Sequence, residues 1–163
     1  MPRLRNYQAT DWDDFLALDI ETGLATMRGA SEDERAVYRS RWPAVLKDRY
    51  GWSEQGPTAD KSVLYVLEDD DGGYAGHLWL SEQEDVRTGV PKLWVTTMAV
   101  VQKHRSRGWG RMLVERVEEE ARSRALTGIG LGVDADNVVA RKLYEEMGFE
   151  TVRLRMVKSL RTR

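Results

Sequence analysis

Cysteine is absent from the 163-residue chain. Its absence excludes a thiol nucleophile, a disulfide framework and a cysteine-ligated zinc site. Histidine is scarce as well: the chain has only His77 and His104, which do not form a His-x-x-x-His metal motif. We therefore expect no metal cofactor.

The chain also lacks a strong excess of either charge, with 25 Lys and Arg residues against 27 Asp and Glu residues and a formal net charge of −2. Proteins that bind DNA or RNA usually carry a basic excess, so we expect no nucleic-acid partner. Apolar runs of about 18 residues and a signal-peptide-like apolar segment are missing too. The sequence thus favours a cytoplasmic protein without a membrane partner.

What is present fits one soluble globular domain over residues 1–163. Hydrophobic residues make up 41% of the chain and charged residues 32%, a balance typical of globular proteins and not of disordered ones. The hydrophobic pattern predicts helices and strands in the order β–α–α–β–β–β–α–β–α–β, a mixed α/β layout. In chain order we expect a strand at 4–7, helices from about 11 and at 32–50, strands at 62–68, 74–82 and 92–101, a helix after Gly110, a strand at 128–134, a helix at 137–147, and one or two strands at 149–159.

Two local signals refine the second of these helices. Ser31 followed by Glu34 is a capping-box pattern and predicts the helix start. Pro43 lies in the middle of the expected helix and should kink or split it, because proline lacks the amide donor and clashes with the preceding turn.

The most specific pattern is Arg105-x-x-Gly108-x-Gly110, at a strand-to-helix junction. The first turn of a helix has amide groups without partners, and glycine lets an anion approach them closely. Arginine adds bidentate phosphate contacts, so the pattern predicts a phosphate or diphosphate site. It lacks the Gly-Lys-Ser/Thr ending of an ATP-binding P-loop, and it does not match the Gly-x-Gly-x-x-Gly dinucleotide pattern.

This pattern, following the strand end "MAVV", resembles the acyl-CoA loop of the GNAT superfamily of N-acetyltransferases. A second stretch, with Asn137, Ala140, Leu143-Tyr144-Glu145 and Gly148-Phe149, resembles the second signature of that family. The resemblance covers most of the chain. It implies a central mixed, mostly antiparallel sheet with splayed middle strands, flanked by helices.

The resemblance also implies roles for individual residues. Pantetheine would lie between the strands at 92–101 and 128–134, with the Met98 amide facing the thioester carbonyl and the Val100 backbone pairing with the pantetheine amides. Tyr144 would stand near the sulfur as a general acid, and Asn137 would contact acetyl-CoA from the opposite side. The diphosphate would be held by Arg105, Ser106, Arg107, Gly108, Trp109, Gly110 and Arg111.

Each of these assignments has a structural alternative. The arginines could form a solvated basic face, Asn137 could be a simple helix cap, and Tyr144 could be a packed core tyrosine. Trp109 reads more readily as a packing residue than as a stack for adenine. His77 is expected to sit on its strand without a substrate role, and His104 to be a loop or phosphate-rim residue.

The sequence lacks an obvious general base at the position where the family usually has one. Many family members place a glutamate on the strand that here reads KLWVTTMAVV, which contains no carboxylate. A lysine-type amine costs about 4–5 kcal/mol to deprotonate at pH 7, whereas an α-amine costs about 1–1.5 kcal/mol. The sequence therefore leans towards an amine of low pKa, or towards a base from elsewhere: Glu82, Glu84, Glu21 or water.

The sequence thus predicts transfer of an acetyl group from acetyl-CoA to a primary amine of a small molecule or peptide. The alternative is an acyl-CoA-binding sensor or interaction module with little catalysis. The acceptor, the acyl-chain preference and the oligomeric state stay open, and a homodimer would suit the family. We expect the acceptor pocket between the first two helices, the 81–92 loop and the C-terminal strands. Four tryptophans could line it, although most are expected to be core residues: Trp42, Trp52, Trp79 and Trp94.

Two further patterns concern the second half of the chain. Gly128, Gly130 and Gly132 alternate, so one face of their strand is bare, and we expect a packed helix or the pantetheine arm against it. The C-terminal basic residues could meet an anionic acceptor or a partner surface, although a solvated edge is the simpler reading: Arg153, Arg155, Lys158, Arg161 and Arg163.

Overall fold

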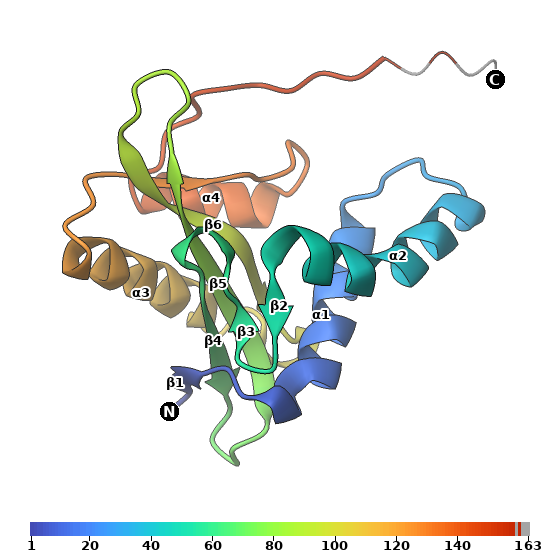
Figure 1. Cartoon of the computed structure of the whole chain (residues 1–163), viewed down its shortest axis with the longest axis horizontal. Coiled ribbons are helices and arrows are strands. Elements are labelled where there is room, and N and C mark those ends of the chain that lie inside the picture. Colours follow the sequence, from blue (N-terminus) through green and yellow to red (C-terminus); the bar gives the residue numbers. More distant parts are fainter. Residues whose placement is uncertain (159, 161–163) are drawn as a thin grey trace. The chain divides into compact units, whose positions relative to one another are not determined.

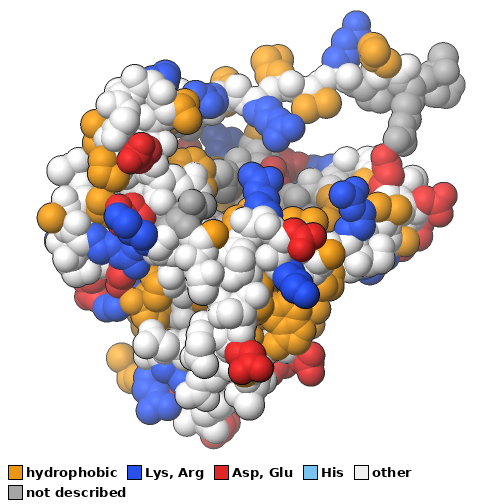
Figure 2. Space-filling model, viewed as in Figure 1, with side chains coloured by type: hydrophobic (Ala, Val, Ile, Leu, Met, Phe, Trp, Pro, Cys, Tyr) orange, Lys and Arg blue, Asp and Glu red, His pale blue; other side chains and the backbone are white. Residues whose placement is uncertain are grey.

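The computed structural model describes residues 1–158 and 160 (Figure 1). The chain divides into two compact units, residues 1–132 and a second unit that begins at Val133, and each is described by itself. Arg161 and Arg163 lie outside the described residues. Acidic and basic side chains are interspersed over the face seen in Figure 2, as the balanced net charge predicts. No described helix is long and apolar enough to cross a bilayer.

The first unit is built on a five-stranded sheet. Its strands follow the spatial order β1-β4-β5-β6-β7, and all neighbours are antiparallel except β6 and β7, which are parallel. This mixed, mostly antiparallel sheet confirms the predicted fold class. The strands are β1 (Arg3–Asn6), β4 (Val63–Glu68), β5 (Tyr74–Glu84), β6 (Pro91–Val100) and β7 (Ile129–Leu131).

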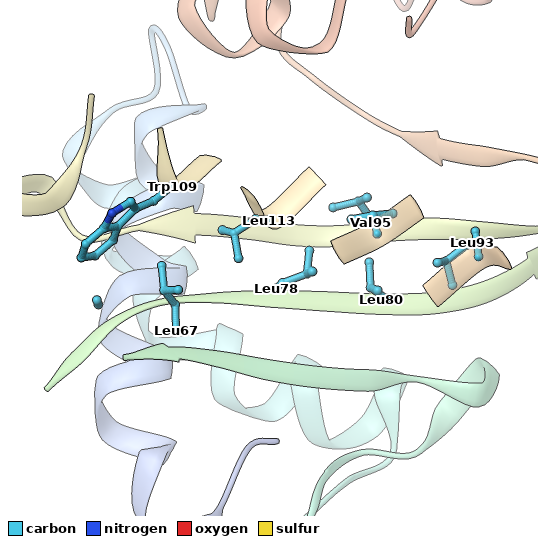
Figure 3. Packing of buried hydrophobic residues seen from close by; sticks show 10 residues of the cluster. Leu67, Leu78, Leu80, Leu93, Val95, Trp109 and Leu113 are labelled. Carbon is cyan, nitrogen blue, oxygen red and sulfur yellow. The ribbon is translucent and has the colours of Figure 1, made fainter. Parts of the chain in front are cut away.

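Helices cover both faces of this sheet (Figure 1). On one face, α3 (Trp109–Ser123) inserts Leu113 and Val117 among buried side chains of the central strands, including Leu78 and Val95 (Figure 3). On the other face, α1 (Trp12–Ala25) and α2 (Glu32–Tyr50) cover an aromatic cluster. Burial of such side chains contributes about 1.5–3 kcal/mol each, so the two clusters fix the sheet between its helices.

The predicted capping box of α2 is present. The Ser31 hydroxyl accepts from the Glu34 amide at 3.3 Å, and the Ser31 amide donates to the Glu34 carboxylate at 2.8 Å. Pro43 lies inside α2 without splitting it, and the alternative, a kink, stays a prediction. One missing donor inside a 19-residue helix leaves the remaining ladder in place.

Several short elements fall in segments that were expected to be loops. A two-stranded ribbon joins β2 (Trp52–Ser53) to β3 (Gly56–Pro57) after α2. Three short 3-10 turns complete the first unit: Ala9–Asp11, Ala59–Lys61 and Gln102–His104.

The second unit contains α4 (Val138–Glu146), close to the predicted helix. The prediction of strands at 149–159 was wrong for the described residues, because residues 149–158 form neither helix nor strand. Ser159 lies outside the described residues. The side chains of Val152, Leu154 and Met156 are exposed. Alternation supplies one amphipathic face, but a strand forms only beside a hydrogen-bonding neighbour, and no other strand exists among the described residues of this unit.

Candidate active site

The glycine turn at the start of α3 has the geometry of an anion site. Gly108 is the N-cap residue with φ of 81°, and Ser106 has φ of 61°, so the chain passes twice through the left-handed region. Within the described part of the chain, the amides of residues 106–110 have no hydrogen-bond acceptor. Unpartnered amides at a helix start attract anions, and a Cβ added at Gly108 would meet nothing within 4 Å.

A buried cluster fixes this turn to the rest of the unit. The Trp109 and His104 rings stack with centroids 4.6 Å apart, and both residues are buried. His104 Nε2 lies 3.2 Å from the Asp69 carboxylate in the β4–β5 turn. The Gly73 amide, above all, holds the pKa of Asp69 below its usual range. Trp109 therefore lies in the packed interior and His104 anchors the turn.

The arginines of the turn differ from one another. Arg105 donates from Nε to the Val100 carbonyl at 2.8 Å, and its guanidinium lies 3.3 Å from Glu21 on α1. The Arg105 backbone amide donates to the Gln102 carbonyl. Arg107 and Arg111 are exposed at the turn. Phosphate contact by these side chains stays a prediction.

Beyond Val95, the edge of β6 that faces β7 has no strand partner. The two strands pair only from Leu93 to Val95, opposite 129–131, so the ladder ends where Thr96 begins. On the other edge of β6, the Val101 amide donates to Ala75. Because hydrogen-bonded and non-bonded pairs alternate in an antiparallel ladder, the amides of Met98 and Val100 point away from β5, towards the unpaired edge. All three residues of β7 pair with β6, so the expected splay between the strands at 92–101 and 128–134 stays a prediction.

The bare face of β7 is filled differently from the prediction. A Cβ added at Gly130 would lie 2.4 Å from the Trp94 ring, and one at Gly128 would lie 3.2 Å from the Lys92 side chain. Side chains of β6, not a helix or pantetheine, therefore occupy these positions. At Gly132 no described atom lies within 4 Å of the added Cβ, so a role there stays a prediction.

The two remaining predicted residues lie in the second unit. The Asn137 side chain accepts from the Ala140 amide at 3.2 Å and caps α4. Tyr144 is half-buried, with the Phe149 ring 5.6 Å away, and burial raises the pKa of its hydroxyl. Their contacts with acetyl-CoA stay predictions.

The candidate bases have contrasting surroundings. The Glu82 carboxylate lies 2.7 Å from the Lys61 ammonium and 3.9 Å from the Arg124 guanidinium, so it is engaged in a charge cluster. Glu84 is exposed. Glu21 pairs with Arg105. No group of side chains that could hold a metal ion occurs among the described residues.

His77 is fully buried and belongs to a polar chain in the core. Tyr74 Oη lies 2.7 Å from His77 Nδ1, and His77 Nε2 lies 3.5 Å from the Asp19 carboxylate. Burial, the largest cause, raises the pKa of Tyr74, so its hydroxyl keeps its proton beside the ring. Asp19 also accepts from Trp42 at 2.7 Å. The Asp19–Trp42 bond ties α1 to α2, and His77 of β5 lies against it.

Sequence reasoning missed a hydrogen-bonded row on the α1–α2 side of the sheet. Gln83 Nε2 donates to Ser81 Oγ at 3.0 Å, and Ser81 Oγ lies 3.1 Å from Thr96 Oγ1. Gln83 also borders a hollow of about 660 Å³, lined by Arg49, Tyr50, Lys61, Glu82, Gln83 and Glu84. Trp52 and Trp79 pack in the core instead of lining that hollow. The row depends on the register of β5 and β6, which no local sequence signal specifies.

Comparison with known proteins places the chain in a family. Residues 27–149 match the Acetyltransferase (GNAT) family, and the chain belongs to that family. Over 94 residues, it is 34% identical to the mycothiol acetyltransferase of Beutenbergia cavernae. That match covers 57% of this chain but only 30% of the relative.

Solved structures agree in fold. A protein of Pyrococcus furiosus described as a candidate acetyl transferase superposes with a TM-score of 0.78 at 23% identity, covering 98% of this chain and all of the other. A ribosomal-protein-alanine N-acetyltransferase from Brucella melitensis gives a TM-score of 0.66 at 18% identity, over 98% and 99% of the two chains. At these identities the likeness concerns the fold.

Proposed function

We propose that the protein transfers an acetyl group from acetyl-CoA to a primary amine of a small molecule or peptide. The observation that carries this proposal is the row of unpartnered amides at 106–110 beside the open edge of β6. The amides at 106–110 supply the donors that a diphosphate needs. The open edge of β6 supplies the unpaired strand edge that the amides of a pantetheine arm need.

We propose the following roles for these residues in binding coenzyme A. The turn amides would hold the diphosphate, with Arg107 and Arg111 close by. Met98 and Val100 offer amides along the open edge of β6, and Arg105 would release the Val100 carbonyl to an amide of the bound arm. Asn137 is proposed as a further cofactor contact.

The chemistry requires a polarised carbonyl, a neutral amine and a proton for the leaving sulfur. Acetyl-CoA supplies a thioester whose carbonyl carbon is open to attack. The Met98 amide would donate to the carbonyl oxygen as it gains negative charge. Tyr144 keeps its proton at neutral pH because burial raises its pKa, which suits it to protonate the sulfur.

The charge cluster around Glu82 argues against that residue as the base, since its carboxylate oxygens are engaged with Lys61 and Arg124. Glu84, Glu21 and water remain. The named relatives do not define the acceptor: one is a mycothiol acetyltransferase, another acts on ribosomal-protein alanine. The acceptor must be argued from this chain.

Calorimetric titration with acetyl-CoA, followed by thiol release with a set of amines, tests the proposal. Binding at one site and release of CoA with an amine are expected. Binding without release for any amine would favour the acyl-CoA-binding module instead. Failure to bind acetyl-CoA, or binding unaffected by changes in the turn, would refute the proposal.

A further inference from the structure

A β-bulge places Thr96 at the start of the β6 edge that has no strand partner, beyond the last pair with β7. Trp79 on β5 pairs with Thr97, and the next residue, Leu80, pairs with Val95, so Thr96 is the extra residue without an opposite partner. It is also the first residue of β6 beyond the last pair with β7. Bulges re-aim side chains next to active sites, and this one turns two consecutive threonines to the same face.

That face is the side from which an acceptor can approach. The opposite face of the sheet is closed, because Leu113 and Val117 of α3 are fully buried against the central strands. Thr96 and Thr97 are partly exposed on the α1–α2 side. An amine that reaches the open edge of β6 from there passes the Thr96 hydroxyl.

The hydrogen-bonded row gives the Thr96 hydroxyl a direction. Ser81 is 2% exposed and accepts a proton from Gln83 Nε2. A side-chain NH₂ group can only donate, and Thr96 Oγ1 is the remaining partner of the Ser81 hydroxyl among the described residues. A buried hydroxyl proton needs an acceptor, so we assign Ser81 as the donor to Thr96, which leaves the Thr96 proton to donate outwards.

If the protein transfers acetyl groups as proposed, a Thr96 hydroxyl that donates outwards limits which amine can accept the acetyl group. The amine must attack with its lone pair, so that lone pair cannot also accept the Thr96 proton. The hydroxyl needs a different acceptor atom, close to the amine on the same molecule. The absence of a carboxylate from residues 92–101 separately favours an amine of low pKa.

We infer that the acceptor is an α-aminoacyl amine, such as a peptide N-terminus or an amino-acid amide, and that Thr96 is a specificity-determining residue that bonds its carbonyl oxygen. Ser81 and Gln83 are positioning residues. In the reaction, the N–C bond forms, the C–S bond breaks, and one proton passes overall from nitrogen to sulfur. The α-amine meets both demands: its pKa is near 8, and a carbonyl oxygen lies beside it.

Two probe amines of similar basicity test the inference: glycinamide, which has the carbonyl oxygen, and propargylamine, which has none. Acetyl-CoA binding is first verified by calorimetry, and CoA release is then followed with each probe. We expect kcat/KM to favour glycinamide by roughly tenfold, the value of one well-made hydrogen bond. Thr96→Val should abolish this preference and Thr96→Ser should keep it.

Gln83→Glu separates a directed hydroxyl from mere packing. A carboxylate at position 83 accepts from Ser81, which then accepts from Thr96, so the row reverses with all its hydroxyls present. The preference for glycinamide should disappear as in Thr96→Val. If acetyl-CoA binds, three results would overturn the inference. The two probes could be used equally, neither could be acetylated, or the preference could survive in Thr96→Val or Gln83→Glu. Loss of acetyl-CoA binding itself would instead refute the proposed function.

Discussion

The glycine turn permits a test in which the protein supplies its own control. Gly108 has φ of 81° and Gly72, in the β4–β5 turn, has φ of 80°; a Cβ added at either meets no described atom within 4 Å. An L-residue in the left-handed region costs about 1–2 kcal/mol. Both Gly108→Ala and Gly72→Ala should therefore lower the melting temperature by a similar amount, about 2–8 °C for a chain of this size.

The two variants should differ in ligand binding. At Gly108 the new methyl group stands where an anion would approach the unpartnered amides, whereas at Gly72 it faces solvent. Loss of one charge-assisted hydrogen bond is worth about 1.5–3 kcal/mol, which corresponds to roughly 10- to 100-fold weaker binding of acetyl-CoA. Gly72→Ala should bind acetyl-CoA like the wild type.

Thermal unfolding and isothermal titration with acetyl-CoA measure both quantities on the same samples. Equal acetyl-CoA affinities in the two variants would refute the reasoning that the turn amides grip the diphosphate. Unequal melting temperatures would show that the backbone costs are not matched and would direct attention to the Gly108 turn as a folding element.

Three further predictions follow from other parts of the molecule. Gly132→Val should weaken acetyl-CoA binding with little loss of thermal stability, because an added Cβ meets no described atom within 4 Å; unchanged affinity would remove Gly132 from the site. Tyr144→Phe should lower kcat by at least about 100-fold if the hydroxyl is the general acid, and full retained turnover would reject that role. Burial alone would raise the pKa of Asp11, but its bidentate pair with Arg5 and the Gln8 amide lower it. Asp11→Asn should therefore cost about 2–3 kcal/mol of unfolding free energy at pH 7, a difference that shrinks below about pH 4 as the wild-type carboxylate is protonated; urea titrations at pH 7 and pH 3 measure it.

Local signals account for the parts of the fold that the sequence predicted well. The Ser31 capping box, the glycines around Trp109 and the β-branched run of β6 each act over a few residues, and each appears in the structure. The errors arise where two distant segments must meet. Trp94 fills the bare face at Gly130 only because β6 and β7 pair in one register, and residues 149–158 alternate like a strand without a neighbour to pair with.

The bulge at Thr96 also depends on the pairing of two distant segments. It changes the interpretation of the absent carboxylate at 92–101. A strand without a glutamate suggests a protein that binds acyl-CoA but catalyses poorly. The row from Gln83 to Thr96 offers another explanation: it supplies a donor, which an amine without a neighbouring acceptor atom could not use and an α-aminoacyl acceptor could. An acceptor that loses its proton at small cost reduces the demand on a base. The absent carboxylate and the directed hydroxyl would then be two features of one acceptor preference, so a Thr96→Val variant that lost selectivity while keeping acetyl-CoA affinity would argue for a working enzyme over a binding module.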